Sequence, residues 1–201
     1  MALTQRVIDW QNRGRSVDFR GHQIHVFEQE GEGLPLVMLH GFPSSSYDWQ
    51  PLIDRLEGRR ILAFDFLGFG LSDKPRNHVY SLAWQADLAD ELVRSTFPNE
   101  PVSLLAHDMG TSVATELFAR DLERKLGFDI DGALLFNGSI VLAKASLTRS
   151  QKVLRSRFGG LAAKFSSERI FKREFGAIFS PEHPLSPDEA ADQWSLIGYN
   201  D

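Results

Sequence analysis

The chain has 201 residues, with 22 Lys and Arg against 27 Asp and Glu and a formal net charge of −5. Its 42% hydrophobic and 24% charged residues are typical of a globular protein and exclude disorder as the main state. The absence of cysteine excludes a disulfide framework, a thiolate metal site and a cysteine nucleophile. The acidic balance argues against a nucleic-acid-binding face, and no apolar run reaches the roughly 20 residues of a membrane span. We expect a cytoplasmic protein with no metal site.

Hydrophobic patterning predicts alternating strands and helices from the N-terminal end of the chain. Residues 17–28 read as a hairpin, because apolar and polar residues alternate on both sides of a turn at 20–22. Continuous apolar runs predict buried strands over 34–39, 61–66, 102–106 and 133–136. Helical spacing predicts the elements between them: one around Trp49, Leu52, Ile53 and Leu56; one capped by Ser81 and ended by Pro98; and one with the stripe Val113, Leu117, Phe118 and Leu122, closed at Gly127. This order implies an α/β fold, a mainly parallel sheet with helices on both faces.

The pattern changes after Asn137, where basic residues, serine and glycine become frequent. Short amphipathic helices are predicted around 147–157, 162–175 and 188–197. We therefore expect two parts: residues 1–138 as the N-terminal part of the core, and residues 139–201 as a helical cap.

Three loops should meet beyond the carboxyl ends of the strands, where the chemistry of such sheets lies. They are residues 40–43 (HGFP), 65–75 (DFLGFGLSDKP) and 106–110 (AHDMG). The third joins a strand directly to a helix and has small residues, Ala106 and Gly110, around Asp108. Such residues allow a sharp turn that projects the middle side chain outward in a strained conformation.

These motifs, in this order and with the continuation of the first to Trp49, resemble the α/β-hydrolase fold, in the branch of epoxide hydrolases and haloalkane dehalogenases. The resemblance extends over roughly residues 17–200 and covers the N-terminal part of that fold. It implies that Asp108 is a nucleophile forming an alkyl-enzyme ester, with the backbone N–H groups of Phe42 and Met109 as its oxyanion hole. It also implies substrate contacts from His107, Trp194 and Tyr199, and no cofactor.

Simpler roles are open for several of these residues. An Asp that precedes a helix is most often only an N-cap, which is the alternative for Asp108. His40 is expected to brace its loop, and His107 to point its side chain away from that of Asp108. Asp65 and Asp73 are expected to order their loop through hydrogen bonds.

The sequence departs from the family pattern at its C-terminal end. In this fold the nucleophile is followed by an acid and then by a histidine near the end of the chain. None of the six histidines follows a strand downstream of the cap, and the sheet is expected to stop before its last strands. We therefore expect that the chain alone lacks the catalytic base, does not complete a catalytic cycle, and self-associates through an open sheet edge.

Side chains near the nucleophile favour an epoxide as the small organic substrate. Met109 and Phe42 offer no side-chain donor that could hold a leaving halide, which places haloalkanes behind epoxides. Esters also stand behind epoxides, because Asp108 rather than a serine occupies the nucleophile position. Tyr199 is the one cap tyrosine that could protonate an opening epoxide. The alternatives are a haloalkane dehalogenase-like hydrolase, a non-catalytic binding protein that keeps the fold, and a membrane-surface protein using the basic segment 144–173.

Overall fold

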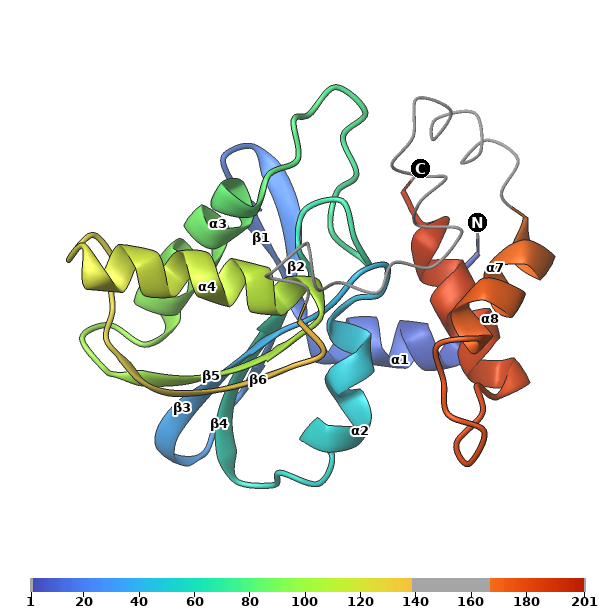
Figure 1. The fold of residues 1–201 in the computed structure, drawn as a ribbon, viewed down its shortest axis with the longest axis horizontal. Helices are drawn as coiled ribbons and strands as arrows, with labels where there is room; N and C mark the ends of the chain where they lie inside the picture. The colour runs from blue at the N-terminus through green and yellow to red at the C-terminus, as the bar shows by residue number, and fades with distance from the viewer. Residues whose placement is uncertain (1, 139–166, 201) are drawn as a thin grey trace.

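The computed structural model describes residues 2–138 and 167–200. Six strands form one sheet in the order β1-β2-β4-β3-β5-β6, as Figure 1 shows. Their bounds are β1 Arg15–Phe19, β2 His22–Gln29, β3 Glu32–Leu39, β4 Arg59–Phe64, β5 Val102–His107 and β6 Ile130–Phe136. Strands β4, β3, β5 and β6 run parallel, and the β1–β2 hairpin joins β4 in the antiparallel sense. The predicted hairpin and the mainly parallel sheet are confirmed.

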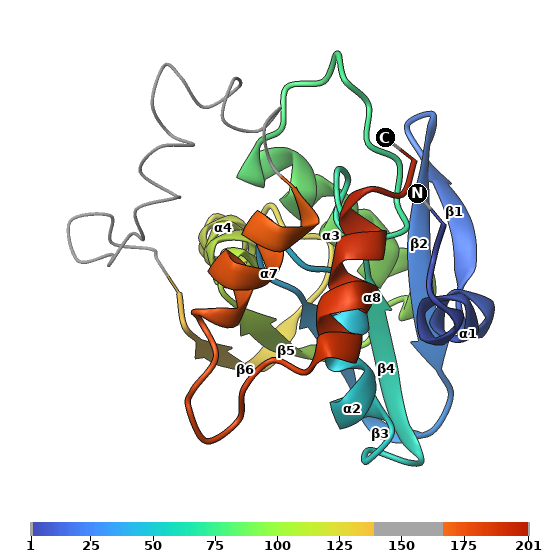
Figure 2. The ribbon, with the colours of Figure 1, turned by 90° about the vertical axis from the view of Figure 1, so that its right-hand side faces the viewer.

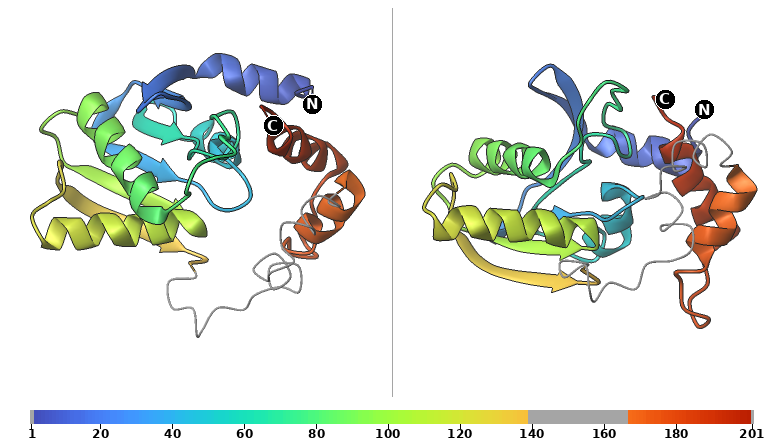
Figure 3. Two further views of the ribbon diagram at one scale, coloured as in Figure 1. Left: turned by 90° about the horizontal axis from the view of Figure 1, so that it is seen from above. Right: turned by 45° about the horizontal axis from the view of Figure 1, so that its top comes forward.

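Helices lie on both faces of the sheet and at one end of the molecule. Their bounds are α1 Gln5–Arg13, the 3-10 turn η1 Ser46–Trp49, α2 Gln50–Ile53, α3 Leu82–Thr96, α4 Met109–Leu122, α7 Glu168–Gly176 and α8 Pro187–Ile197. Helices α3 and α4 lie side by side on one face, while α7 and α8 form a pair at the end of the molecule with α1 beside α8 (Figures 1, 2 and 3). No helix in the described parts of the chain is long and apolar enough to cross a membrane.

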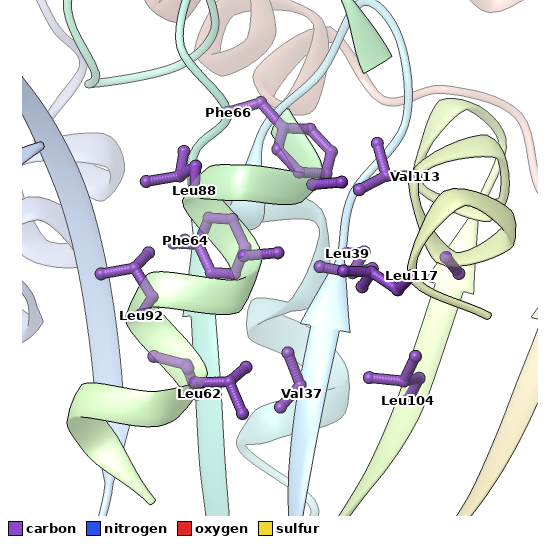
Figure 4. Close-up of a cluster of buried hydrophobic side chains, with 14 of the residues drawn as sticks. Val37, Leu39, Leu62, Phe64, Phe66, Leu88, Leu92, Leu104, Val113 and Leu117 are labelled. Carbon is purple, nitrogen blue, oxygen red and sulfur yellow. The ribbon is translucent and has the colours of Figure 1, made fainter. Parts of the chain in front are cut away.

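The core has two layers because side chains alternate between the faces of the strands. Val37 and Leu39 of β3 join the cluster under α3 and α4, which Figure 4 shows, whereas Met38 joins the cluster under α1 and α2. Leu196 of α8 belongs to this second cluster. Burial on both faces explains why the parallel strands read as continuous apolar runs.

The predicted extent of two elements that precede Asp108 in the chain, the helix around Trp49 and the strand over 61–66, is wrong. The predicted helix around Trp49 is one 3-10 turn followed by a single α-turn that ends at Ile53. The chain then continues in short turns, since the N–H of Leu56 bonds to the carbonyl of Ile53. Strand β4 ends at Phe64 rather than Phe66, because the N–H of Phe66 is taken by the side chain of His40 instead of a neighbouring strand.

The predicted end of α4 is also wrong. The helix is capped at Glu123 rather than Gly127, and Leu122 is 86% exposed instead of lying in the buried stripe. The reversal is made by Arg124 in a left-handed conformation, φ 55°, with the N–H of Lys125 bonded to the carbonyl of Arg120. Glycine is common at such a position but not required.

The predicted cap helices fall partly outside the described residues. Residues 147–157, most of the basic segment 144–173 and the first part of 162–175 lie there. Helix α7 begins at Glu168 after its N-cap Ser167, and α8 confirms the helix predicted over 188–197. Helix α1 was not predicted, although Thr4 caps it and Val7 and Trp10 are buried at helical spacing.

Candidate active site

The turn between β5 and α4 holds Asp108 in a strained conformation. Its backbone has φ 49° and ψ −116°, which an L-residue adopts only when the surroundings impose it. Gly110 allows the turn to press against β3, since a Cβ there would lie 2.3 Å from the carbonyl oxygen of Leu39. The geometry is that of a strand-to-helix turn that presents one side chain beyond the end of the sheet.

Two backbone N–H groups converge on one carboxylate oxygen of this residue. Oδ1 of Asp108 accepts hydrogen bonds from the N–H of Phe42 at 2.8 Å and from the N–H of Met109 at 2.6 Å. Oδ2 has no hydrogen-bond partner among the described residues. Gly41 makes this approach possible, because a Cβ there would lie 2.7 Å from the Cβ of Asp108. The carboxylate is thus fixed through one oxygen and open at the other.

His40 supports the loop that carries Phe42. It is fully buried, and its Nε2 accepts a hydrogen bond from the N–H of Phe66 at 2.9 Å. Its Nδ1 lies 2.8 Å from the carbonyl oxygen of Gly41, which can only accept, so Nδ1 carries the proton. Burial lowers the pKa of His40, in keeping with this neutral form. The prediction that His40 braces its loop is confirmed.

Asp65 fastens the same loop from the side of β4. Its fully buried carboxylate accepts from the N–H of Ser46 at 2.7 Å, from the Ser46 hydroxyl, and from the N–H of Leu71 at 2.7 Å. Asp73 accepts from the N–H of Gln23 at 2.7 Å. Both aspartates order their loops through hydrogen bonds, as the sequence predicted.

A hollow of about 480 Å³ lies beside the nucleophile turn. It shares Phe42 and Met109, whose N–H groups hold Asp108, and its volume lies in the range of small-molecule sites. Three of its apolar side chains are exposed: Phe42 at 48%, Tyr80 at 46% and Leu82 at 43%. The rest of its wall comes from the 65–75 loop, the chain that follows it and α3: Gly68, Phe69, Lys74, Pro75, Arg76, Ser81 and Gln85.

The predicted substrate contacts are scattered. His107 lies at the nucleophile turn, where its ring packs 5.2 Å from that of Phe136. Trp194 packs 5.5 Å from Phe171 of α7. The hydroxyl of Tyr199 accepts from Nε2 of Gln11 at 3.2 Å. Within the described residues, neither Trp194 nor Tyr199 forms a hydrogen bond with Asp108.

Sequence reasoning missed a buried carboxylate on α8. Asp192 has a fully buried side chain and accepts hydrogen bonds from Thr4, Arg6 and Tyr47. A threonine that can cap a helix, Thr4, followed three residues later by the apolar Val7, is a local sequence signal that could have predicted α1. The pairing of α1 with a helix more than 180 residues later has no such signal.

Comparison with known proteins places this geometry in a family. The family model described as the alpha/beta hydrolase fold matches residues 35–132, which include both loops at Asp108. The LipZ protein of Mycobacterium tuberculosis is 50% identical over 195 residues, which are 97% of this chain and 67% of LipZ. The chain belongs to the α/β-hydrolase fold family.

Other members of the α/β-hydrolase family are similar over most of the chain. The mesoderm-specific transcript homolog protein of Homo sapiens is 34% identical over 212 residues, covering 99% of this chain and 62% of the human protein. The solved haloalkane dehalogenase DatA from Agrobacterium tumefaciens C58 superposes with a TM-score of 0.69 at 27% identity, over 92% of this chain and 66% of DatA. The epoxide hydrolase CorEH shares the fold, with a TM-score of 0.66 at 24% identity, over 92% of this chain and 69% of CorEH. This chain thus spans about two thirds of the length of these relatives.

Proposed function

We propose that the chain carries the nucleophile half of an epoxide hydrolase-like site, with Asp108 as the nucleophile. The observation that carries this proposal is the asymmetry of its carboxylate: Oδ1 accepts two backbone N–H groups, whereas Oδ2 has no hydrogen-bond partner within residues 2–138 and 167–200. A helix N-cap does not need a second N–H from a loop 66 residues earlier in the chain. A carboxylate held in this way is positioned to react through its open oxygen.

The first step forms an ester on Asp108. A lone pair of Oδ2 attacks one carbon of an epoxide, the C–O bond of the three-membered ring breaks, and its oxygen takes a proton from an acidic O–H group or from water. The product is a hydroxyalkyl ester of Asp108. The N–H groups of Phe42 and Met109 continue to hold Oδ1, which becomes the ester carbonyl oxygen.

The second step releases the product. Water attacks the carbonyl carbon of the ester, and negative charge develops on Oδ1, where two preorganised donors stabilise it. The attacking water gives a proton to a general base, the tetrahedral intermediate collapses with cleavage of the ester C–O bond, and the leaving oxygen takes a proton, so that a diol leaves and the carboxylate is restored. This step requires a general base, and His40 cannot supply it, because both its nitrogens are engaged in a buried site. No histidine of the chain hydrogen-bonds to the Asp108 side chain among the described residues, and we infer from this that the 201-residue chain completes the first step and stops at the ester.

The hollow beside the site supports a small apolar substrate. Its exposed residues include the apolar or aromatic Phe42, Tyr80 and Leu82 beside the polar Arg76 and Ser81. Met109 lies where a halide-holding donor would be expected in a dehalogenase. We propose an epoxide first, with haloalkanes and esters as alternatives. The contribution of His107, Trp194 and Tyr199 to substrate binding stays a prediction.

The test is covalent labelling of the chain itself. The protein is incubated with styrene oxide or 1,2-epoxyhexane, and its intact mass and peptide map are measured. We expect one adduct on Asp108 in the wild type and none at this peptide in D108N. Wild-type protein without an adduct on Asp108 would support a non-catalytic binding protein, and diol formation over many turnovers would refute the arrest at the ester.

A further inference from the structure

Asp192 joins three elements that are far apart in the sequence. Its carboxylate accepts from the hydroxyl of Thr4, from Nε of Arg6 at 2.8 Å and from the hydroxyl of Tyr47 at 2.9 Å. Burial by itself raises the pKa of Asp192, but the hydrogen bonds from Arg6, Thr4 and Tyr47 outweigh it and keep the pKa below its ordinary value. Helices α1 and α8 and the turn η1 therefore meet at one ionised group.

The next residue along α8 makes a second, parallel connection. Nε2 of Gln193 donates to Oδ1 of Asp48 at 2.6 Å. In the sequence, Gln193 directly follows Asp192 and Asp48 directly follows Tyr47. Two consecutive residues of η1, Tyr47 and Asp48, are thus bonded to two consecutive residues of α8, Asp192 and Gln193. We call these two hydrogen bonds the α8 latch.

The α8 latch acts on the chain that supplies the oxyanion donor. The turn η1 begins at Ser46, whose N–H and hydroxyl are fixed by Asp65. Phe42 lies only five residues before Tyr47, and the segment between them is tied internally, since the Ser44 hydroxyl donates to the carbonyl of Gly41 at 3.3 Å. We expect a shift of η1 to reach the Phe42 N–H through this short segment, because close-packed parts of a protein transmit strain.

Packing of α8 does not depend on the α8 latch alone. Leu196 is buried in the cluster under α1 and α2, and Ala190 and Ser195 are buried as well. Phe175 and Phe171 of α7 add aromatic contacts to this end of the molecule. Loss of one hydrogen bond of the α8 latch should leave α8 folded, so its effect on the active site can be measured separately from its effect on folding.

We propose that Asp192 and Gln193 are positioning residues for the reaction of Asp108, acting through η1 and the Phe42 N–H. This inference rests on the function proposed above. The α8 latch holds the oxyanion loop against Oδ1, and this contact fixes the direction of Oδ2. A misplacement of about 1 Å at a reacting group can cost up to about a hundred-fold in rate.

The experiment compares Q193A with the control D188N. Asp188 lies on the same helix, its side chain is 78% exposed, and among the described residues it bonds to Nη1 of Arg6 and to no atom of η1. Amide hydrogen exchange of the peptide covering 41–49 reports the loop, and the rate of Asp108 labelling by 1,2-epoxyhexane reports the site. For Q193A we expect faster exchange in 41–49 and a roughly ten-fold lower maximal labelling rate, with the half-saturating epoxide concentration unchanged. D188N should match the wild type in both readouts.

A swapped pair separates positioning from general destabilisation. Q193E alone loses the hydrogen bond, because it sets two carboxylates against each other, whereas D48N alone can keep it, because an amide oxygen still accepts from Nε2 of Gln193. The double variant D48N/Q193E restores the bond that Q193E loses, with donor and acceptor exchanged. We expect slow exchange in 41–49 and most of the labelling rate to return in the double variant. Wild-type exchange and wild-type labelling in Q193A, or no rescue by the swap, would overturn the proposal. If the wild type itself is not labelled, the proposed function fails, and the exchange data still decide the role of the α8 latch.

Discussion

The backbone N–H of Phe42 lies 2.8 Å from Oδ1 of Asp108, although 66 residues of chain separate them. The register of the sheet explains this approach. Strand β3 pairs with β5 in parallel, with Leu39 opposite Ala106, so the two loops leave the sheet at the same height. The oxyanion donor and the nucleophile are therefore neighbours because their strands are neighbours, and small changes at the loop junction should be felt at the carboxylate.

Replacement of Gly41 by alanine should separate these two groups. The added Cβ would lie 2.7 Å from the Cβ of Asp108, and the loop would have to move away from the turn. We expect a loss of about 1–3 kcal/mol in the free energy of unfolding and at least a roughly ten-fold lower rate of Asp108 labelling by an epoxide. G132A is the matched control, because nothing lies within 4 Å of a Cβ at Gly132. Equal labelling of G41A and the wild type would contradict this prediction.

Replacement of Asp65 by asparagine should weaken the support of the oxyanion loop. The carboxylate accepts from two backbone N–H groups and one hydroxyl, and an amide would place its own N–H₂ donor against one of them. A buried donor left unsatisfied costs about 1–3 kcal/mol, and more where a charge was involved. Urea denaturation should show a loss of about 2–4 kcal/mol for D65N. D54N is the control, since Asp54 is 43% exposed and pairs only at the surface; a D65N as mildly affected as D54N would count against the role of Asp65.

The carboxylate of Asp192 should make stability depend on acid pH. Its hydrogen bonds keep its pKa below the value of about 3.9 that an unfolded aspartate has. The stabilisation is therefore fully present above that unfolded value and is lost as the pH falls through the lower, folded pKa. D192N lacks this contribution, so the difference in unfolding free energy between wild type and D192N should be largest near neutral pH and shrink below about pH 4. Urea titrations at several pH values measure it, and a constant difference would show that the charge of Asp192 is not what stabilises the junction.

Elements that depend on local chemistry could be predicted from the sequence, and those that depend on distant partners could not. The parallel strands are buried on both faces and read as apolar runs, and the nucleophile turn needs the small residues that frame Asp108. The junction at Asp192 depends on Arg6, 186 residues away, and no spacing rule links the two. Tyr199 illustrates the same limit for the fold: its hydroxyl bonds to Gln11 of a helix that the patterning missed, while its backbone carbonyl accepts from Nζ of Lys74 in the wall of the hollow, and its role in substrate binding stays a prediction.

The exposed face of β6 should drive self-association of the chain. This strand is the last of the described sheet, and its Leu134 is 62% exposed, with Leu135 and Phe136 each at 36%. An end strand with exposed apolar side chains is a template for pairing with another chain. We expect an average mass by light scattering that rises with protein concentration, and a lower rise for L134K. L122K is the control: Leu122 is 86% exposed at the end of α4, so its replacement removes a larger exposed fraction of a leucine than L134K does and leaves the sequence of β6 unchanged. A concentration-independent monomer mass for the wild type, or an equal effect of both variants, would show that β6 is not the associating surface.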